Sequence, residues 1–165
     1  MKCKISEYLD AGIIQKAKHV QGEVISNIFL VPKKETGKFR MILNLKKLNL
    51  DVEYQHFKMD TIQAALRLVT PNCYMMSLDI KDAYFSVNIF PPDRKYLRFM
   101  YDDQLYEFTC LPNGLSSGPR LFTKILKVPL SHLRKNQAVS SSAFIDDCFL
   151  QDQAPRDCHM AVSHS

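Results

Sequence analysis

Two adjacent carboxylates, Asp146 and Asp147, interrupt an apolar run at residues 143–150. A charge within a half-buried strand is costly unless it is paired or binds a metal ion. The flanking residues favour strands, so the pattern predicts a tight hairpin with both aspartates at its tip and with Phe144 and Phe149 in its arms. An Asp-Asp pair can also be an ordinary surface turn, because turns favour aspartate.

A third carboxylate, Asp79, ends a second apolar run at residues 73–79. If the two runs pair as strands, three carboxylates converge on one point. Mg²⁺ takes oxygen ligands and usually keeps water or substrate phosphate in its shell. Two such ions about 4 Å apart form the clamp used for in-line phosphoryl and nucleotidyl transfer. The pattern therefore predicts a site for divalent cations.

Composition restricts the class of protein. The 165 residues suit one domain, and 46% hydrophobic with 24% charged residues is typical of a globular chain rather than a disordered one. A net charge of +5 suits a polyanionic partner. No stretch has the features of a signal peptide or approaches the about 20 apolar residues of a membrane span, so we expect a cytoplasmic or nuclear protein without a membrane partner.

The cysteines are scattered, without a C-x-x-C pair or zinc-type spacing, and indicate free thiols in a reducing compartment. They are Cys3, Cys73, Cys110, Cys148 and Cys158.

The patterning of the first 70 residues predicts two helices with a hairpin between them. These elements are a helix at 6–18, a hairpin with arms at 28–31 and 39–43, and a short helix at 60–69. Ser6 can cap the first helix. Asp60, with Gln63 three residues on, resembles a capping box for the second. Gly37 lies in the charged hairpin turn, where a positive φ is favoured.

The rest of the chain predicts mainly strands around one helix. These elements are strands at 73–78 and 86–90, a hairpin at 97–101 and 104–111, a helix beginning at Pro119, and the aspartate hairpin. Asp102-Asp103 reads as an ordinary hairpin turn. Pro119 suits a first helical turn, and Pro129 predicts a kink or an end. From Gln151 the pattern fades, and the mix predicts an α+β fold with antiparallel pairing at its centre.

Several blocks of this sequence together resemble the fingers and palm of a reverse transcriptase from retroviruses and long-terminal-repeat-like retrotransposons. They cover residues 29–34, 39–40, 45–49, 77–85, 111–119 and 144–147, in that order. Residues 53–59 are most similar to the tyrosine-recombinase (DIRS-type) elements. The resemblance implies a polymerase-type fold with a central antiparallel sheet packed by helices. It places the fingers at about 1–55 and 87–117 and the palm at about 56–86 and 118–165.

The resemblance implies that Asp79, Asp146 and Asp147 hold two Mg²⁺ ions, with the Ile80 carbonyl as an extra ligand and Mn²⁺ as a substitute. One ion would lower the pKa of the primer 3′-hydroxyl, and the other would neutralise charge on the triphosphate. The implied partners are an RNA or DNA template with its primer and a deoxynucleoside triphosphate.

The resemblance also assigns residues to the incoming nucleotide. The backbone N–H groups of Asp82 and Ala83 would form a phosphate nest, although Asp82 could equally cap a helix. Tyr84 would exclude a ribose 2′-hydroxyl; without the motif it would read as a core residue. Asn113 would face the 3′-hydroxyl and base, where the family usually has glutamine or phenylalanine, and its shorter reach affects sugar positioning.

The basic fingers turn would grip the triphosphate, with Lys33 as a point charge and Arg40 as a planar fork. Other lysines nearby could be solvated or could contact template phosphates: Lys34, Lys38, Lys46 and Lys47. The helix start at Gly118 and Pro119 would lie near the template strand. Phe144 occupies a position that the family more often fills with tyrosine.

Beyond the aspartate hairpin the family continues with more palm, a primer-gripping hairpin, a thumb and commonly a ribonuclease H domain. We expect either a fragment of a longer polymerase, truncated before the thumb, or a decayed copy. The first functional hypothesis is therefore an RNA-directed DNA polymerase domain, and the second is a silent remnant that binds nucleic acid weakly. An unrelated α+β binding module is the third. We also expect residues from Gln151 onward to be poorly packed.

Overall fold

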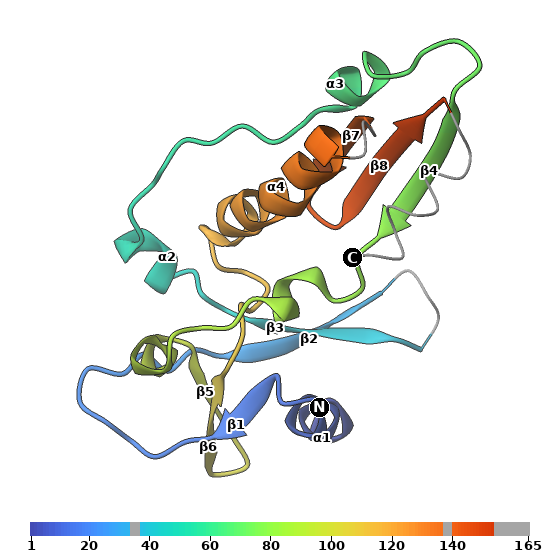
Figure 1. The fold of residues 1–165 in the computed structure, drawn as a ribbon. Coiled ribbons are helices and arrows are strands. Elements are labelled where there is room, and N and C mark those ends of the chain that lie inside the picture. The colour runs from blue at the N-terminus through green and yellow to red at the C-terminus, as the bar shows by residue number, and fades with distance from the viewer. Residues whose placement is uncertain (34–36, 137–139, 154–165) are drawn as a thin grey trace. The chain divides into compact units, whose positions relative to one another are not determined.

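The computed structural model describes residues 1–33, 37–136 and 140–153. The chain divides into two compact units, the first formed by residues 1–54 and 84–118 and the second by residues 55–83 and 119–165. Antiparallel sheets and a few helices make up both units, which confirms the α+β class (Figure 1). Among the described residues, no helix is long and apolar enough to span a lipid bilayer.

The first unit contains most of the strands. Its elements are α1 (Lys2–Asp10), β1 (Ile14–Lys16), β2 (Ile28–Pro32), β3 (Phe39–Leu43), α2 (Leu48–Asp51), β5 (Arg98–Tyr101) and β6 (Gln104–Phe108), with the 3-10 helix η2 (Pro91–Tyr96) before β5. The 3-10 helix η1 (Ala83–Ser86) begins where the second unit meets the first. Strands β1, β6 and β5 form an antiparallel sheet in that order, and β2 pairs with β3 as a hairpin.

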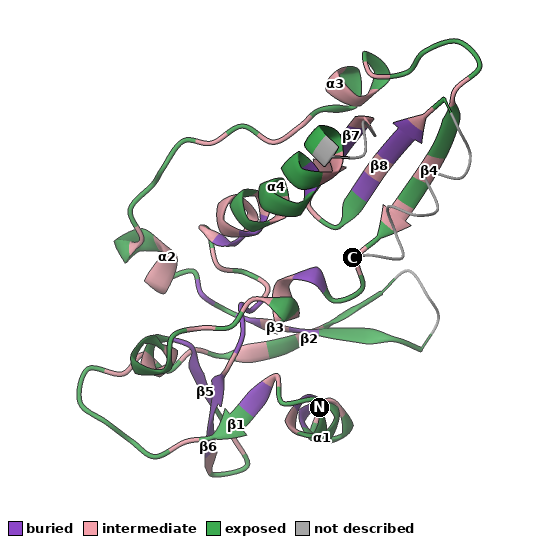
Figure 2. Ribbon diagram, in the orientation of Figure 1, coloured by how far each residue is buried: buried purple, intermediate pink, exposed green. Residues whose placement is uncertain are grey.

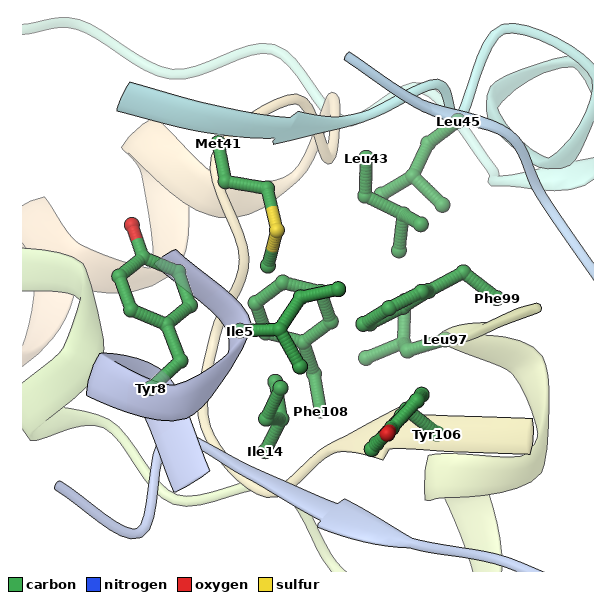
Figure 3. Close-up of a cluster of buried hydrophobic side chains, with 10 residues drawn as sticks. All are labelled: Ile5, Tyr8, Ile14, Met41, Leu43, Leu45, Leu97, Phe99, Tyr106 and Phe108. Carbon is green, nitrogen blue, oxygen red and sulfur yellow. The ribbon is translucent and has the colours of Figure 1, made fainter. Parts of the chain in front are cut away.

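A core of aromatic and aliphatic side chains holds the first unit together (Figure 3). It draws on α1, β1, β3, β5 and β6 and on residues just after β3 and just before β5. It consists of Ile5, Tyr8, Ile14, Met41, Leu43, Leu45, Leu97, Phe99, Tyr106 and Phe108. Phe99 stacks on Tyr106 with ring centroids 5.4 Å apart, and Tyr8 meets Phe85 edge to face at 5.3 Å. Burying these side chains supplies the main favourable free energy of folding for this unit.

The second unit is a three-stranded antiparallel sheet with a long helix packed on one face. Its elements are α3 (Ile62–Leu66), β4 (Tyr74–Asp79), α4 (Gly118–Asn136), β7 (Ser140–Phe144) and β8 (Asp147–Asp152), with strand order β4-β8-β7. Leu150 on the central strand is buried against Met76 of β4 and Leu133 of α4. Figure 2 shows buried residues along this central strand, whereas the residues of β4 are exposed or half-buried.

The first helix differs from the prediction. It spans Lys2–Asp10 rather than 6–18, so Ser6 lies inside it and does not cap it. Gly12 adopts φ +68°, a left-handed conformation that ends helices readily because glycine has no Cβ. The next residues then pair as β1 with β6, with Ile14 opposite Phe108. Residues 14–16, which the prediction placed in the helix, therefore belong to a strand.

The predicted capping box is also wrong. Thr61 caps α3, because its Oγ1 accepts a hydrogen bond from the Ala64 N–H at 3.2 Å. Helix α3 ends at Leu66, short of the predicted Val69. The Asp60 carboxylate instead binds strand β7, as described below.

Two further predictions differ from the structure: the strand at 86–90 is wrong, and of the kink or end predicted at Pro129 the end is wrong, while the kink stays a prediction. Residues 86–90 form no strand among the described residues; η1 and one isolated bridge, Asn88 to Cys110, replace it. Helix α4 continues through Pro129 to Asn136 and does not end at the proline. A proline removes one backbone hydrogen bond, and tertiary packing of the apolar helix face can offset that loss.

Both predicted hairpins of the first unit are confirmed. The arms of one are β2 and β3, with Leu30 opposite Met41, and Gly37 in its turn has φ +80°. Residues 34–36 of that turn lie outside the described residues. The other hairpin turns at Asp102 and Asp103, both at positive φ, as a two-residue turn of the primed type requires.

The prediction of poor packing from Gln151 onward is wrong for Gln151 itself. This residue lies in β8 opposite Met75 and is only 5% exposed. Its Oε1 accepts a hydrogen bond from the Thr70 N–H at 3.2 Å. Residues 154–165 lie outside the described part of the chain.

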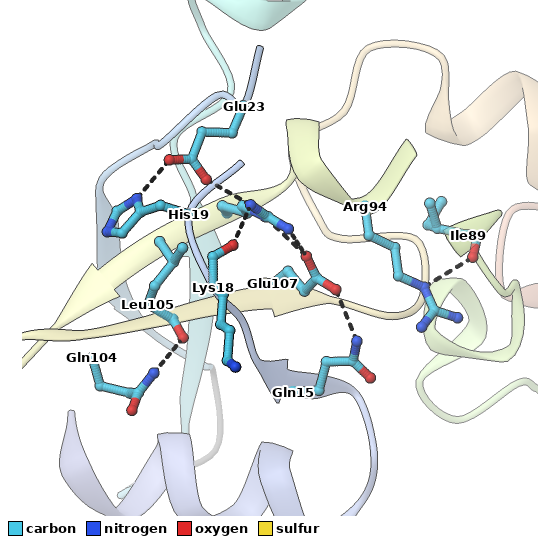
Figure 4. A network of polar contacts seen from close by, with 10 residues as sticks. Gln15, Lys18, His19, Glu23, Ile89, Arg94, Gln104, Leu105 and Glu107 are labelled. Atoms are coloured by element: carbon cyan, nitrogen blue, oxygen red, sulfur yellow. Dashed lines mark hydrogen bonds and ion pairs between the residues drawn. The ribbon is translucent and has the colours of Figure 1, made fainter. Parts of the chain in front are cut away.

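A buried ion network ties the first unit together across distant segments (Figure 4). Arg98 on β5, 6% exposed, donates from Nε and Nη2 to Glu107 Oε2 at 2.9 and 2.6 Å. Its Nη1 donates to Glu23 Oε2 at 2.6 Å and to the Lys18 carbonyl at 3.0 Å. Gln15 Nε2 donates to the other Glu107 oxygen at 2.8 Å. One guanidinium therefore fixes the segment after β1 onto β5 and β6.

The charges in this network shift the pKa values of its members. Hydrogen bonds from His19 and Arg98 hold the pKa of Glu23 below its ordinary value. Burial lowers the pKa of Arg98, but its hydrogen bonds to Glu23 and Glu107 outweigh that effect and raise the pKa overall. Both shifts favour the charged forms, as paired ions require.

The described cysteines, Cys3, Cys73, Cys110 and Cys148, are free thiols, as predicted, and Cys158 lies outside the described residues. Burial raises the pKa of Cys110 to about 11, and the thiolate is the nucleophilic form.

We therefore expect iodoacetamide at pH 8 to alkylate exposed Cys3 rapidly in the folded chain and Cys110 far more slowly. Peptide mass spectrometry measures both rates. Denaturation in urea should equalise them, and equal rates in the folded chain would contradict the buried position of Cys110.

Candidate functional site

The aspartate hairpin turns through two residues, Ile145 and Asp146, because Phe144 and Asp147 are paired across β7 and β8. Ile145 has φ +56°. Two-residue hairpin turns often need positive φ at the first central position, where glycine is usual. A β-branched residue there is a strained exception, and such strain costs about 1–3 kcal/mol. The surrounding strands therefore impose the conformation that presents Asp146.

The end of β4 joins this turn, which confirms the predicted pairing of the two apolar runs. Asp79 lies opposite Asp147 in the antiparallel pair of β4 and β8. Just beyond it, the Ile80 N–H donates to the Asp146 carbonyl at 2.9 Å. The backbone thus places three aspartates and Ile80 at one end of one sheet.

The side chains of Asp79, Asp146 and Asp147 are all exposed. Like charges placed directly opposite in a sheet are destabilising, which favours a cation between Asp79 and Asp147. Burial, and then the charges of Asp147 and Asp146, raise the pKa of the neighbouring Cys148 thiol. A negative potential therefore surrounds the turn.

The donor chemistry fits Mg²⁺, because carboxylates and a backbone carbonyl are the hard oxygen ligands that this ion prefers. In the described structure, however, the carboxylate side chains are not oriented around a common metal position. Within the described ranges, no three His, Cys, Asp or Glu side chains are arranged to hold a metal ion. The predicted ligand set of Asp79, Asp146 and Asp147 therefore stays a prediction.

The residues that follow Asp79 turn sharply. Asp82 has φ +51°, a conformation that aspartate tolerates better than most residues. Ala83 begins η1 and is 6% exposed. Both belong to the second unit with the aspartates, whereas Tyr84 belongs to the first. The phosphate nest and the alternative helix cap both stay predictions.

The other expected nucleotide-binding residues, Lys33, Arg40 and Asn113, also lie in the first unit. Lys33 and Arg40 are exposed and flank the turn of the β2–β3 hairpin. The Lys33 N–H donates to the Lys38 carbonyl at 2.8 Å, which closes the base of that turn. Two positively charged side chains therefore extend from the end of one hairpin.

Asn49 is a residue whose role the sequence did not reveal. Its Nδ2 donates to the Gly114 carbonyl and its Oδ1 accepts from the Ser116 N–H, both at 2.9 Å. Gly114 has φ +112°, and a Cβ there would lie 2.9 Å from the Leu43 carbonyl oxygen. The loop that carries Asn113 is thereby held by one asparagine side chain from α2 and by a close backbone approach.

Asp60 is the second residue whose role was missed. Its Oδ2 accepts hydrogen bonds from Ser142 Oγ at 3.1 Å and from the Ala143 N–H at 3.3 Å. These contacts fix the segment ahead of α3 to β7, just before the Ile145 turn. Only the tertiary structure reveals this contact, because the partners are more than 80 positions apart.

A family model described as "Reverse transcriptase (RNA-dependent DNA polymerase)" matches residues 31–164, most of the chain. The chain belongs to the reverse transcriptase family. The match includes the Asp79 and Asp146 segments and the β2–β3 hairpin from Val31 onward.

Curated relatives of this reverse transcriptase chain include transposon polyproteins of Schizosaccharomyces pombe. The Tf2-3 polyprotein is 25% identical over 154 residues, which cover 93% of this chain and 11% of the polyprotein. The Tf2-7 polyprotein is 27% identical over 139 residues, covering 84% and 10% respectively. The chain thus spans about a tenth of the length of these relatives.

Solved reverse transcriptases share the fold. A foamy viral protease-reverse transcriptase in complex with double-stranded DNA superposes with a TM-score of 0.82 at 20% identity, covering 99% of this chain and 32% of that one. The prototype foamy virus protease-reverse transcriptase gives 0.80 at 20% identity, covering 99% and 21%. At this identity the likeness establishes the fold alone.

Proposed function

We propose that this reverse transcriptase chain supplies the fingers and palm of an RNA-directed DNA polymerase of a retrotransposon. Its reaction joins a deoxynucleoside triphosphate to the 3′-hydroxyl of a primer on an RNA or DNA template. The pairing of Asp79 with Asp147, beside the strained turn that presents Asp146, is the observation that carries the proposal. Residues 53–59 favour a DIRS-type element, or otherwise a long-terminal-repeat-like one.

Asp79, Asp146 and Asp147, with the Ile80 carbonyl, are the proposed ligands of two Mg²⁺ ions, which Mn²⁺ can replace. Such ions supply Lewis-acid stabilisation of the charge that develops in nucleotidyl transfer. The carboxylates themselves attract and orient cations at the end of the sheet. The hydrogen bond from Ile80 to the Asp146 carbonyl keeps the turn and the end of β4 in register.

The remaining residues bind the substrates in this proposal. Lys33 and Arg40 hold the triphosphate, since an ammonium and a planar guanidinium both bind phosphate oxygens. The backbone N–H groups of Asp82 and Ala83 assist, and Asn113 contacts the sugar from the loop that Asn49 holds. The template strand runs past the start of α4, at Gly118 and Pro119.

A catalytically silent domain that binds nucleic acid weakly is the second candidate. The net charge of +5 favours it, because phosphate contacts by surface lysines and arginines need no catalytic site. Ribonuclease H and thumb domains from a longer polyprotein would be the partners of either form.

Primer extension tests the proposal. A protein that joins residues 1–165 to a thumb segment should extend a primer with deoxynucleotides and Mg²⁺. The isolated chain should extend it little, because a misplacement of the primer end by about 1 Å costs roughly 100-fold in rate. Absence of synthesis by the thumb-containing protein, with template binding intact, would favour the silent domain.

Tyr84 tests sugar selection in the same protein. Tyr84→Ala should admit ribonucleotides, whereas Tyr84→Phe should still exclude them, because the ring and not the hydroxyl makes the clash. One such contact is worth about 1–3 kcal/mol, or roughly 10–200-fold in discrimination. Gel analysis of ribonucleotide incorporation measures the ratio. Equal incorporation by the wild type and Tyr84→Ala would remove Tyr84 from this role.

A further inference from the structure

A cavity of about 270 Å³ lies in the second unit, between α4, β7 and the segment ahead of α3. Sites for small molecules usually measure about 300–1,000 Å³, so this cavity suits a ligand near the small end of that range. None of the residues assigned to nucleotide or metal binding lines it. Ile145, which precedes Asp146 in the turn, does.

One side of the cavity is apolar. Leu126 and Leu130 of α4 face it together with Ala143 of β7 and Ile145. Leu130 is 4% exposed and belongs to the packed interior, so this wall is fixed by the fold. An apolar group of about the size of one aromatic ring can pack against it.

The charges around the cavity sum to +1. Lys127 and Arg134 extend from α4, and of the described lining residues Asp60 alone carries a negative charge. Asp60 already accepts hydrogen bonds from Ser142 and Ala143, which compensate its charge. In the described structure Lys127 makes no ion pair, so its ammonium group remains available to an anion.

A buried hydroxyl supplies the second, independent observation. Thr123 lines the cavity, and its Oγ1 is buried without a hydrogen-bond partner among the described residues. Buried polar atoms are nearly always paired, and an unpaired one destabilises the fold. Because this atom has almost no accessible surface, a rotation of the Thr123 side chain would turn its hydroxyl into the cavity, where a ligand oxygen could accept its hydrogen bond.

We propose that this cavity binds a small organic acid, a carboxylate or phosphate monoester on an apolar body of about one ring. Lys127 pairs with the anionic group, Thr123 Oγ1 donates to it, and the ring packs on Leu126 and Leu130. The site lies beside the aspartate turn and is independent of the polymerase function, because it uses none of the residues assigned to that function.

Nuclear magnetic resonance of the ¹⁵N-labelled full chain tests the site. Phenyl phosphate and benzoate should give saturable shifts at the amides of Thr123, Lys127 and Ala143, with a Kd on the order of 1 mM, a typical affinity for a ligand of this size. Benzyl alcohol, which has the ring without the charge, should give none. Inorganic phosphate, which lacks the ring, should bind at least about tenfold more weakly than phenyl phosphate.

Three variants assign the contacts. Lys127→Met should weaken phenyl phosphate binding about tenfold or more, while Lys124→Met, on the same helix but outside the cavity, should not change it. Thr123→Val should weaken binding without lowering the thermal midpoint, because replacing an unpaired buried hydroxyl by a methyl group removes a destabilising feature.

Several results would overturn the proposal. These are shifts that do not saturate, equal binding of benzyl alcohol or inorganic phosphate, and an equal effect of Lys127→Met and Lys124→Met. Tighter binding of a thymidine dinucleotide than of phenyl phosphate would assign the phosphate to nucleic acid and would also overturn it.

Discussion

Replacing Asp146 with asparagine is expected to abolish primer extension by the thumb-containing protein, with a loss of roughly 10³-fold or more in rate. The carboxylate would contribute charge stabilisation worth several kcal/mol, and about 1.4 kcal/mol corresponds to tenfold in rate. An asparagine has the same shape but no charge. The fold should survive, because the Asp146 backbone carbonyl and not its side chain accepts the Ile80 hydrogen bond.

Asp102→Asn is the matched control. Asp102 also lies in a two-residue hairpin turn beside a second aspartate, and its φ of +51° is one that asparagine adopts readily. We expect this variant to retain full activity. Circular dichroism should confirm that both variants are folded. If Asp146→Asn extends primers at the wild-type rate, the aspartate turn is not the catalytic site.

Replacing Arg98 with methionine is expected to lower the free energy of unfolding by about 3–5 kcal/mol, because it leaves carboxylates buried without their cation. Glu107 is 7% exposed, and Glu23 lies in the same network. That loss is a large share of the roughly 5–15 kcal/mol by which domains are stable, so partial unfolding at 25 °C is expected. Urea denaturation monitored by circular dichroism measures the change.

Arg94→Met is the control for losing an arginine nearby. Arg94 Nε donates a hydrogen bond to the Ile89 carbonyl at 3.1 Å, as Figure 4 shows. Its loss should cost about 1 kcal/mol. The double variant Arg98→Met with Glu107→Leu should recover part of the stability, since it removes both a cation and a buried anion. A loss below about 1 kcal/mol for Arg98→Met would contradict the importance of the network.

Local sequence patterns were sufficient to predict the family and the two hairpins of the first unit. The turn at Asp102-Asp103 and the β2–β3 hairpin follow from residues that are neighbours in sequence, because turn type and strand alternation are local properties. The aspartate blocks likewise predicted that β4 and β8 pair. The assignment of the two units to fingers and palm, and of the site residues to their roles, stays a prediction.

Tertiary structure decided the features that depend on distant partners. Ile14 joined a strand and not a helix because β6, more than 90 positions away, offers it a hydrogen-bonded edge. Asp60 binds β7, and Asn49 holds the Asn113 loop, through side-chain hydrogen bonds that no local pattern encodes. No sequence pattern indicated a structural role for Arg98, which follows only from its ion pairs with Glu23 and Glu107 in the folded chain. Propensity and spacing report only near neighbours, whereas buried polar groups take whichever partner the folded chain brings within hydrogen-bond distance.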